Sequence, residues 1–101
     1  MSVDLQEETI TDVFIKTPSL YNVVLHNDDK TTFEFVIVIL QEIFNKSFQD
    51  ALIITQDVHE KGKQIVDTYT KEVALQKVNE ATTAARQYGF PLIVTAEEND
   101  Q

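Results

Sequence analysis

The chain has 101 residues, 43% of them hydrophobic, and a formal net charge of −9. This length allows one small domain and is too short for two. The acidic charge argues against nucleic acid and anionic membranes as partners, because phosphate groups would repel it. No Cys is present, which excludes disulfides and thiolate chemistry.

The acidic charge is concentrated at the two ends of the chain. Residues 1–16 hold four acids against one Lys, and residues 97–101 hold three acids and no base. We therefore expect a flexible acidic N-terminal arm over residues 1–17, a folded domain over residues 18–97 and a short acidic tail over residues 98–101.

The N-terminal residues lack the basic and apolar regions of a secretory signal. The longest uninterrupted apolar run, Phe35–Leu40, is too short to cross a bilayer. A cytoplasmic location is therefore expected.

The first expected element is a strand. Residues 20–26 place two sets of side chains in strict alternation, with Tyr21, Val23 and Leu25 on one face and Asn22, Val24 and His26 on the other. A helix should follow, because Thr31 and Glu34 have the spacing of a capping box. The run FVIVILQEIF extends this helix to about Lys46.

A second helix is expected from Ser47, whose spacing to Asp50 repeats the capping pattern. Its apolar stripe contains Ala51, Thr55 and Val58, and Gly62 is a suitable C-terminal stop. The segment KQIVDTYT, residues 63–70, then predicts a short strand.

Thr70 should cap a third helix, which Gly89 ends and Pro91 keeps from resuming. Its apolar positions recur at helical spacing: Ala74, Val78, Ala81, Ala85 and Tyr88. Residues 92–96, LIVTA, predict a last strand. The sequence therefore predicts an α+β fold of order β-α-α-β-α-β, a sandwich in which a small three-stranded antiparallel sheet packs on three helices.

Motifs of catalysis are absent from the sequence. The only glycines, Gly62 and Gly89, form no phosphate loop, and no Ser lies in a nucleophile elbow. Asp28, Asp29 and His59 lack the spacing of a calcium or zinc site. We expect no enzyme activity, no cofactor and no metal.

The bend Asn27-Asp28-Asp29 has two interpretations. Its side chains could satisfy backbone N–H groups ahead of a helix N-terminus. They could also form an acceptor cluster for an α-ammonium group, with His59 as a further acceptor. His59 also has an alternative explanation, because a basic side chain in the last turn of a helix interacts favourably with the helix dipole.

Apolar residues flank this polar cluster. Phe33 and Val36 follow the bend, and Thr55 and Val58 lie within a turn of His59. If the first two helices meet, these four side chains could line a slot beside the acceptors. Plain core packing is the alternative.

Several segments together resemble one known family. The segments YNVVLHNDDKTTFEFV, DVHEKGK, TKEVALQKV and PLIVT occur in the order found in ClpS, the adaptor of the bacterial N-end rule pathway. The resemblance covers Pro18 to about Glu97. It implies a non-enzymatic protein that binds N-degrons and delivers them to the chaperone ClpA of the ClpAP protease.

The resemblance also assigns expected roles to residues. Asn27, Asp28 and His59 would hold the free α-amino group, with Asp29 and Thr31 adjoining. A hydrophobic pocket for a first-residue Leu, Phe, Tyr or Trp would be formed by Phe33, Val36, Val38, Thr55, Val58 and Leu92. The family commonly has Met at positions 33 and 55, where this chain has Phe and Thr.

The chaperone-docking face implied by the resemblance contains Glu72 and Lys77, with Lys30 and the edge of His59 nearby. Many relatives have Tyr in place of Lys30. The expected partner is the N-terminal domain of ClpA, which the arm before Pro18 would engage during hand-over. The adaptor itself is expected to be a monomer.

Two other classes remain as alternatives. A structural interaction domain similar to the C-terminal domain of the ribosomal stalk protein would bind protein surfaces and ignore free amino termini. A hydrolase using Asp28 and His59 is the more distant alternative. Asp28→Ala separates an adaptor from a scaffold, since only the adaptor should lose degron binding.

Overall fold

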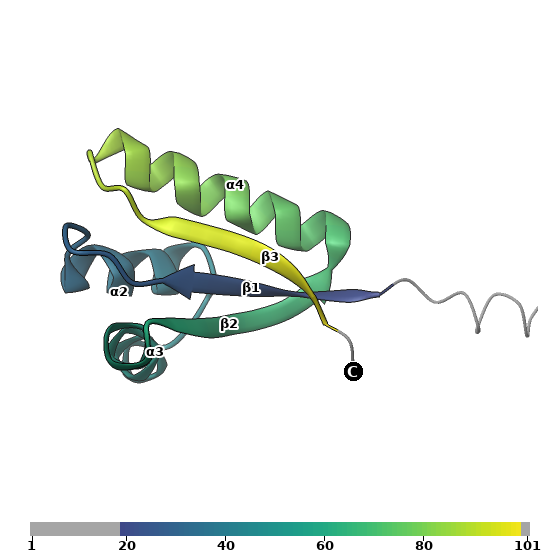
Figure 1. Ribbon diagram of the computed structural model, residues 1–101, viewed down its shortest axis with the longest axis horizontal. Helices are drawn as coiled ribbons and strands as arrows, with labels where there is room; N and C mark the ends of the chain where they lie inside the picture. Colours follow the sequence, from purple (N-terminus) through teal and green to yellow (C-terminus); the bar gives the residue numbers. More distant parts are fainter. Residues whose placement is uncertain (1–18, 100–101) are drawn as a thin grey trace, which may run out of the picture.

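The computed structural model describes residues 19–99. The expected arm and the last two residues lie outside the described residues. Six elements follow along the chain (Figure 1): β1 (Leu20–His26), α2 (Phe33–Glu42), α3 (Phe48–Lys61), β2 (Lys63–Thr70), α4 (Lys71–Gln87) and β3 (Ile93–Asn99). This confirms the predicted β-α-α-β-α-β order and the α+β class.

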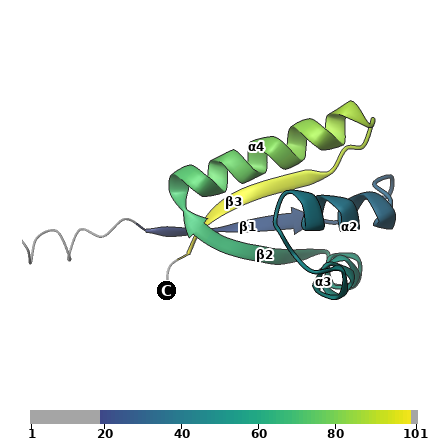
Figure 2. The same ribbon diagram turned by 180° about the vertical axis from the view of Figure 1, so that it is seen from behind.

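The sheet has β1 at its centre, in the order β2-β1-β3, and both neighbours run antiparallel to β1. Val23 and Leu25, which share one face of β1, belong to a buried cluster that also contains residues of α2, α3 and α4. All three helices therefore cover the same face. Figures 1 and 2 show α4 along the length of the sheet, while α2 and α3 lie toward the end where β1 stops.

The start of α2 differs by one residue from the prediction. Thr32, and not Thr31, is the N-cap, and its hydroxyl oxygen accepts the N–H of Phe35 at 3.2 Å. The Thr31 hydroxyl instead donates to the Asp28 carboxylate at 2.7 Å. The backbone N–H of Thr31 also donates to this carboxylate, so Asp28 holds Thr31 in the loop and the capping position falls to Thr32.

The end of α2 also comes earlier than expected, at Glu42 and not near Lys46. Asn45 has a left-handed backbone with φ of 58°, which Asn tolerates better than most residues. This turn lets the N–H of Lys46 bond to the carbonyl of Leu40 at 2.9 Å. The helix is therefore closed by a tight turn before Ser47 starts the next one.

The bounds of α3 and β2 agree with the prediction. The Ser47 hydroxyl accepts the N–H of Asp50 at 3.0 Å, and Gly62 follows α3 with a left-handed φ of 91°. The stripe of Ala51, Thr55 and Val58 is buried. β2 begins directly after this glycine, so the end of α3 is fixed at one edge of the sheet.

α4 buries alanines against the sheet, and β3 extends further than predicted. Ala74, Ala81 and Ala85 are buried, and their small side chains let α4 lie close to the strands. Thr70 occupies the N-cap position of α4 without a side-chain capping bond. β3 continues to Asn99, which pairs with Leu20, so the expected boundary after Glu97 falls inside a strand.

Candidate functional site

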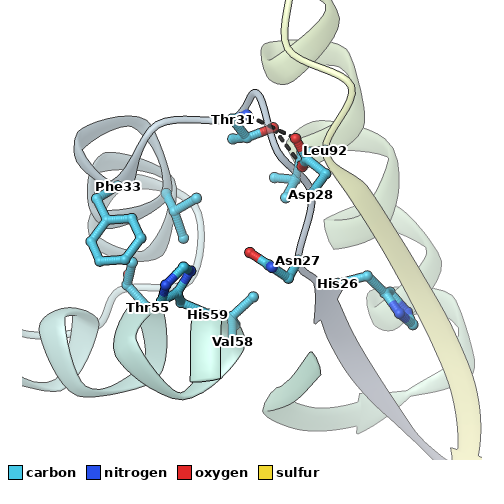
Figure 3. Close-up of a pocket in the computed structure, with 10 residues that line it drawn as sticks. His26, Asn27, Asp28, Thr31, Phe33, Thr55, Val58, His59 and Leu92 are labelled. Carbon is cyan, nitrogen blue, oxygen red and sulfur yellow. Dashed lines mark hydrogen bonds between the residues drawn. The ribbon is translucent and has the colours of Figure 1, made fainter. Parts of the chain in front are cut away.

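A small cavity lies where the loop after β1 meets α2 and α3 (Figure 3). Its free space is about 20 Å³, roughly the room needed for one water molecule. The lining contains most of the residues expected at the site, together with His26: Asn27, Asp28, Thr31, Phe33, Val36, Thr55, Val58, His59 and Leu92. The structure therefore brings these residues together around one cavity.

Asn27 and His59 line the same cavity because the end of β1 is hydrogen-bonded to the end of α3. The backbone N–H of Asn27 donates to the Gly62 carbonyl at 2.9 Å, and His59 lies in the last turn of α3. In Figure 3 the carboxamide of Asn27 points toward the His59 ring. Its side chain makes no hydrogen bond with the residues that the structure describes, so it remains available to a ligand.

Asp28 holds the loop together. One carboxylate oxygen accepts the backbone N–H groups of Lys30 and Thr31, both at 2.8 Å, and the other accepts the Thr31 hydroxyl. Burial alone would raise the pKa of this carboxyl, but these hydrogen bonds and the positive charge of Arg86 lower it below its ordinary value. The loop interpretation of Asp28 is thus correct, and the carboxylate also brings a fixed negative charge to the cavity.

The mouth of the cavity carries an aromatic contact. The rings of Phe33 and His59 meet edge to face, with centroids 5.2 Å apart and planes at 71°. Both residues are exposed at the surface. Pairs of this geometry contribute about 0.5–1.5 kcal/mol, so the contact is weak enough to open.

The walls behind the mouth are apolar and closed to solvent. Val36, Val58 and Leu92 are buried, and they come from α2, α3 and the segment before β3. Thr55 lies among them and is itself buried. A ligand side chain that entered here would leave water almost completely.

Arg86 supports this wall and was not predicted from the sequence. Its guanidinium donates to the carbonyls of Phe90 and Leu92, both at 2.9 Å, and so fixes the segment that presents Leu92. Its position in the last turn of α4 was the available signal, since basic residues there often bond nearby carbonyls. His26 was also missed, but its ring turns away from the cavity (Figure 3) and bonds the Thr95 hydroxyl at 2.8 Å.

Val38 does not line this cavity, and its assignment to the hydrophobic pocket is corrected. It is 51% exposed and lines a separate groove between α2 and α4, together with Phe35 and Tyr88. The reason is helical geometry, because two residues after Val36 correspond to about 200° of rotation around the helix. Asp29, expected beside the amine-binding residues, is exposed and does not line the cavity.

The three residues expected at a docking face do not share one surface. Glu72 is exposed near Thr70, which pairs with Leu20 at the start of β1, whereas Lys30 follows the other end of that strand. Lys77 is half-buried, not fully exposed, and donates to the Ile43 carbonyl at 2.8 Å. The expectation that Lys30 lies near Glu72 is therefore wrong.

The part of the chain that the structure describes contains neither a metal-binding cluster nor a helix that could span a membrane. Within residues 19–99, no group of three or more His, Cys, Asp or Glu side chains is placed to hold a metal ion. No helix in that range has the length and apolar character needed to span a membrane.

Comparisons with known proteins place the chain in the class of protease adaptors. Residues 16–95 match the family model described as ATP-dependent Clp protease adaptor protein ClpS. Relatives named as ATP-dependent Clp protease adapter protein ClpS include one from Desulforapulum autotrophicum, 52% identical over 80% of this chain and 78% of its own length. Another, from Lawsonia intracellularis, is 46% identical over 86% of this chain and 80% of its own.

A solved structure agrees with this class. Agrobacterium tumefaciens ClpS2 bound to L-phenylalaninamide superposes with a TM-score of 0.80 at 36% identity, covering 81% of this chain and 99% of that one. The chain belongs to the ClpS family. The resemblance seen in the sequence is thereby confirmed, and the relatives are adapter proteins by name, not enzymes.

Proposed function

We propose that the cavity captures the free α-amino group and the bulky first side chain of N-degron substrates, and that the protein delivers them to ClpA for degradation by ClpAP. The observation that carries the proposal is that Asn27 and His59 both line one cavity with apolar walls, with the Asn27 carboxamide directed toward the His59 ring. An N-terminal residue presents the complementary arrangement, with a charged amine beside a side chain. The protein acts by binding alone, without catalysis or a cofactor.

The amine is held by complementary acceptors. An ammonium group has three donors, which the carboxamide oxygen of Asn27 and a lone pair of the neutral His59 ring can accept. Asp28 contributes negative charge beside the amine, while its two carboxylate oxygens also accept hydrogen bonds from the loop. The L-phenylalaninamide bound to the Agrobacterium tumefaciens relative supports this, since it carries a free α-amino group beside a phenyl ring.

The first side chain enters between the apolar walls once Phe33 moves. The free space of about 20 Å³ holds roughly one water molecule, so lining side chains shift when a Leu or Phe side chain enters, and the exposed Phe33 ring in contact with His59 is the one best placed to move. That contact contributes about 0.5–1.5 kcal/mol, while burying a Leu or Phe side chain contributes about 1.5–3 kcal/mol. The exchange favours binding, and the displaced ring can pack against the incoming residue. The substrates are those with Leu, Phe, Tyr or Trp in first position.

Delivery uses a second surface, which binds the N-terminal domain of ClpA. Glu72 is the main candidate because it is exposed in the first turn of α4. Lys77 is half-buried against Ile43, so it contributes through the position of α2 as well as through its charge. Lys30 would form a separate contact at the other end of the sheet. No observation favours the alternative of a stalk-like structural domain.

Two variants separate substrate binding from docking to the chaperone. Asp28→Ala should abolish binding of a labelled peptide that begins with Leu, while the variant still binds the isolated N-terminal domain of ClpA. Glu72→Ala should give the converse result. If Asp28→Ala leaves peptide binding intact, or if neither protein binds any free amino terminus, the proposed function is wrong.

A further inference from the structure

Thr55 is the feature of the cavity that its apolar lining does not explain. It is 3% exposed and is the only buried polar residue within residues 19–99. Its hydroxyl oxygen has no hydrogen-bond partner among those residues. Buried polar groups are almost always paired, so an unpaired hydroxyl in a binding cavity suggests a partner that arrives with the ligand.

The position of Thr55 fits the far end of a first side chain. Thr55 and His59 are four residues apart on α3, so they lie on the same face, separated by a rise of about 6 Å along the helix. His59 is exposed at the mouth, whereas Thr55 is closed off beside Val36 and Val58. A substrate held by its amine at His59 therefore extends a long side chain toward Thr55.

The chemistry of the hydroxyl selects among long side chains. A Thr hydroxyl both donates and accepts, and so does the phenol of Tyr. Leu and Phe offer no polar atom, so they leave the hydroxyl unpaired in surroundings where water is excluded. Tyr differs from Phe only by the atom that the hydroxyl can bond, which makes these two residues the sharpest comparison.

We infer that Thr55 is a specificity-determining residue that favours Tyr over Phe as the first residue of a substrate. This inference rests on the proposed function, because it requires that the first side chain enters this cavity. One added hydrogen bond between neutral groups corresponds to about threefold to tenfold in Kd. An apolar side chain at this position could not supply the bond.

A local explanation competes with this role. A Thr inside a helix can donate to the carbonyl one turn earlier, which here belongs to Ala51. The structure shows no such hydrogen bond. If that bond formed in solution, the hydroxyl would be satisfied internally and would not distinguish Tyr from Phe.

The test measures a ratio of affinities in three proteins. Peptides that differ only in first residue, Tyr or Phe, are titrated into the wild type, Thr55→Val and Thr55→Ser by fluorescence anisotropy. Val keeps the shape of Thr without the hydroxyl, and Ser keeps the hydroxyl. We expect the ratio of the Phe Kd to the Tyr Kd to fall by about threefold to tenfold in Thr55→Val and to be largely retained in Thr55→Ser.

The outcomes separate this inference from the proposed function. Equal ratios in the wild type and Thr55→Val overturn the role of Thr55, even if both peptides bind well. A wild type that binds free and acetylated Leu peptides equally, or binds neither, overturns the proposed function and this inference together. If Thr55→Val fails to fold, the other two proteins decide. A preference for the Tyr peptide of about threefold to tenfold in both the wild type and Thr55→Ser supports the inference, and equal Kd values for the Tyr and Phe peptides in both contradict it.

Discussion

Replacing Asn27 by Ala should weaken substrate binding without weakening the fold. The Asn27 side chain is exposed and makes no hydrogen bond with other residues of the described part of the chain. The bond that joins the loop to α3 comes from its backbone N–H, which Ala retains. The free energy of unfolding should therefore change by no more than about 0.5 kcal/mol.

The loss of binding follows from the bond that the side chain would make. A hydrogen bond to a charged group contributes about 1.5–3 kcal/mol. Losing one bond to the ammonium should raise Kd by about tenfold to about 150-fold. The effect should be the same for Leu and Phe peptides, since the amine is common to both.

The assay is an anisotropy titration with a labelled Leu peptide, accompanied by urea unfolding of each protein. Asn79→Ala is the matched control, because it makes the same chemical change on an exposed position of α4 away from the cavity. Wild-type affinity in Asn27→Ala would refute the reasoning. So would a loss of affinity that merely parallels a loss of stability.

Two further predictions concern stability. The pKa of Asp28 is lowered in the folded state, so its charged form stabilises the fold above the ordinary value of 3.8, and this contribution is lost as acid protonates the carboxyl. Asp28→Asn should therefore lower the free energy of unfolding by about 1–2 kcal/mol at neutral pH, with a smaller difference below that value, in urea titrations across pH. A difference that grows in acid would contradict this. Leu92→Ala should lower the free energy of unfolding by about 2–5 kcal/mol, because Leu92 is fully buried. Val38→Ala should lower it by less than about 1 kcal/mol, because Val38 is 51% exposed. If urea unfolding gave equal losses of unfolding free energy for the two variants, the exposed position of Val38 would be wrong.

The element order could be predicted because local signals mark most boundaries. Ser47 and Gly62 bracket α3 by capping chemistry that depends only on neighbouring residues. The predicted start of α2 was one residue early because two neighbouring threonines could each serve as the N-cap. Thr31 and Thr32 are adjacent, and only the folded position of Asp28 decides which one caps α2.

The site could be predicted only in part, for a related reason. The Asn-Asp-Asp bend and His59 were visible as chemistry, but their meeting depends on a bond between Asn27 and Gly62, which are far apart in the sequence. Val38 was assigned from the family resemblance, and the residue pattern could not correct it because apolar residues occur all round α2. Arg86 acts through backbone carbonyls, so its position in the last turn of α4 was the signal available in the sequence, and that signal does not say which carbonyls it bonds.

The central claim is that a free α-amino group is recognised by the acceptors at the mouth of the cavity. Two peptides that begin with Leu and differ only in acetylation of that amine test it most directly. Acetylation removes the charge and two of the three donors, so at least one of Asn27 and His59 is left without a partner beside an occupied cavity. The account predicts that the free peptide binds and the acetylated one does not, whereas equal affinities for the two would contradict it.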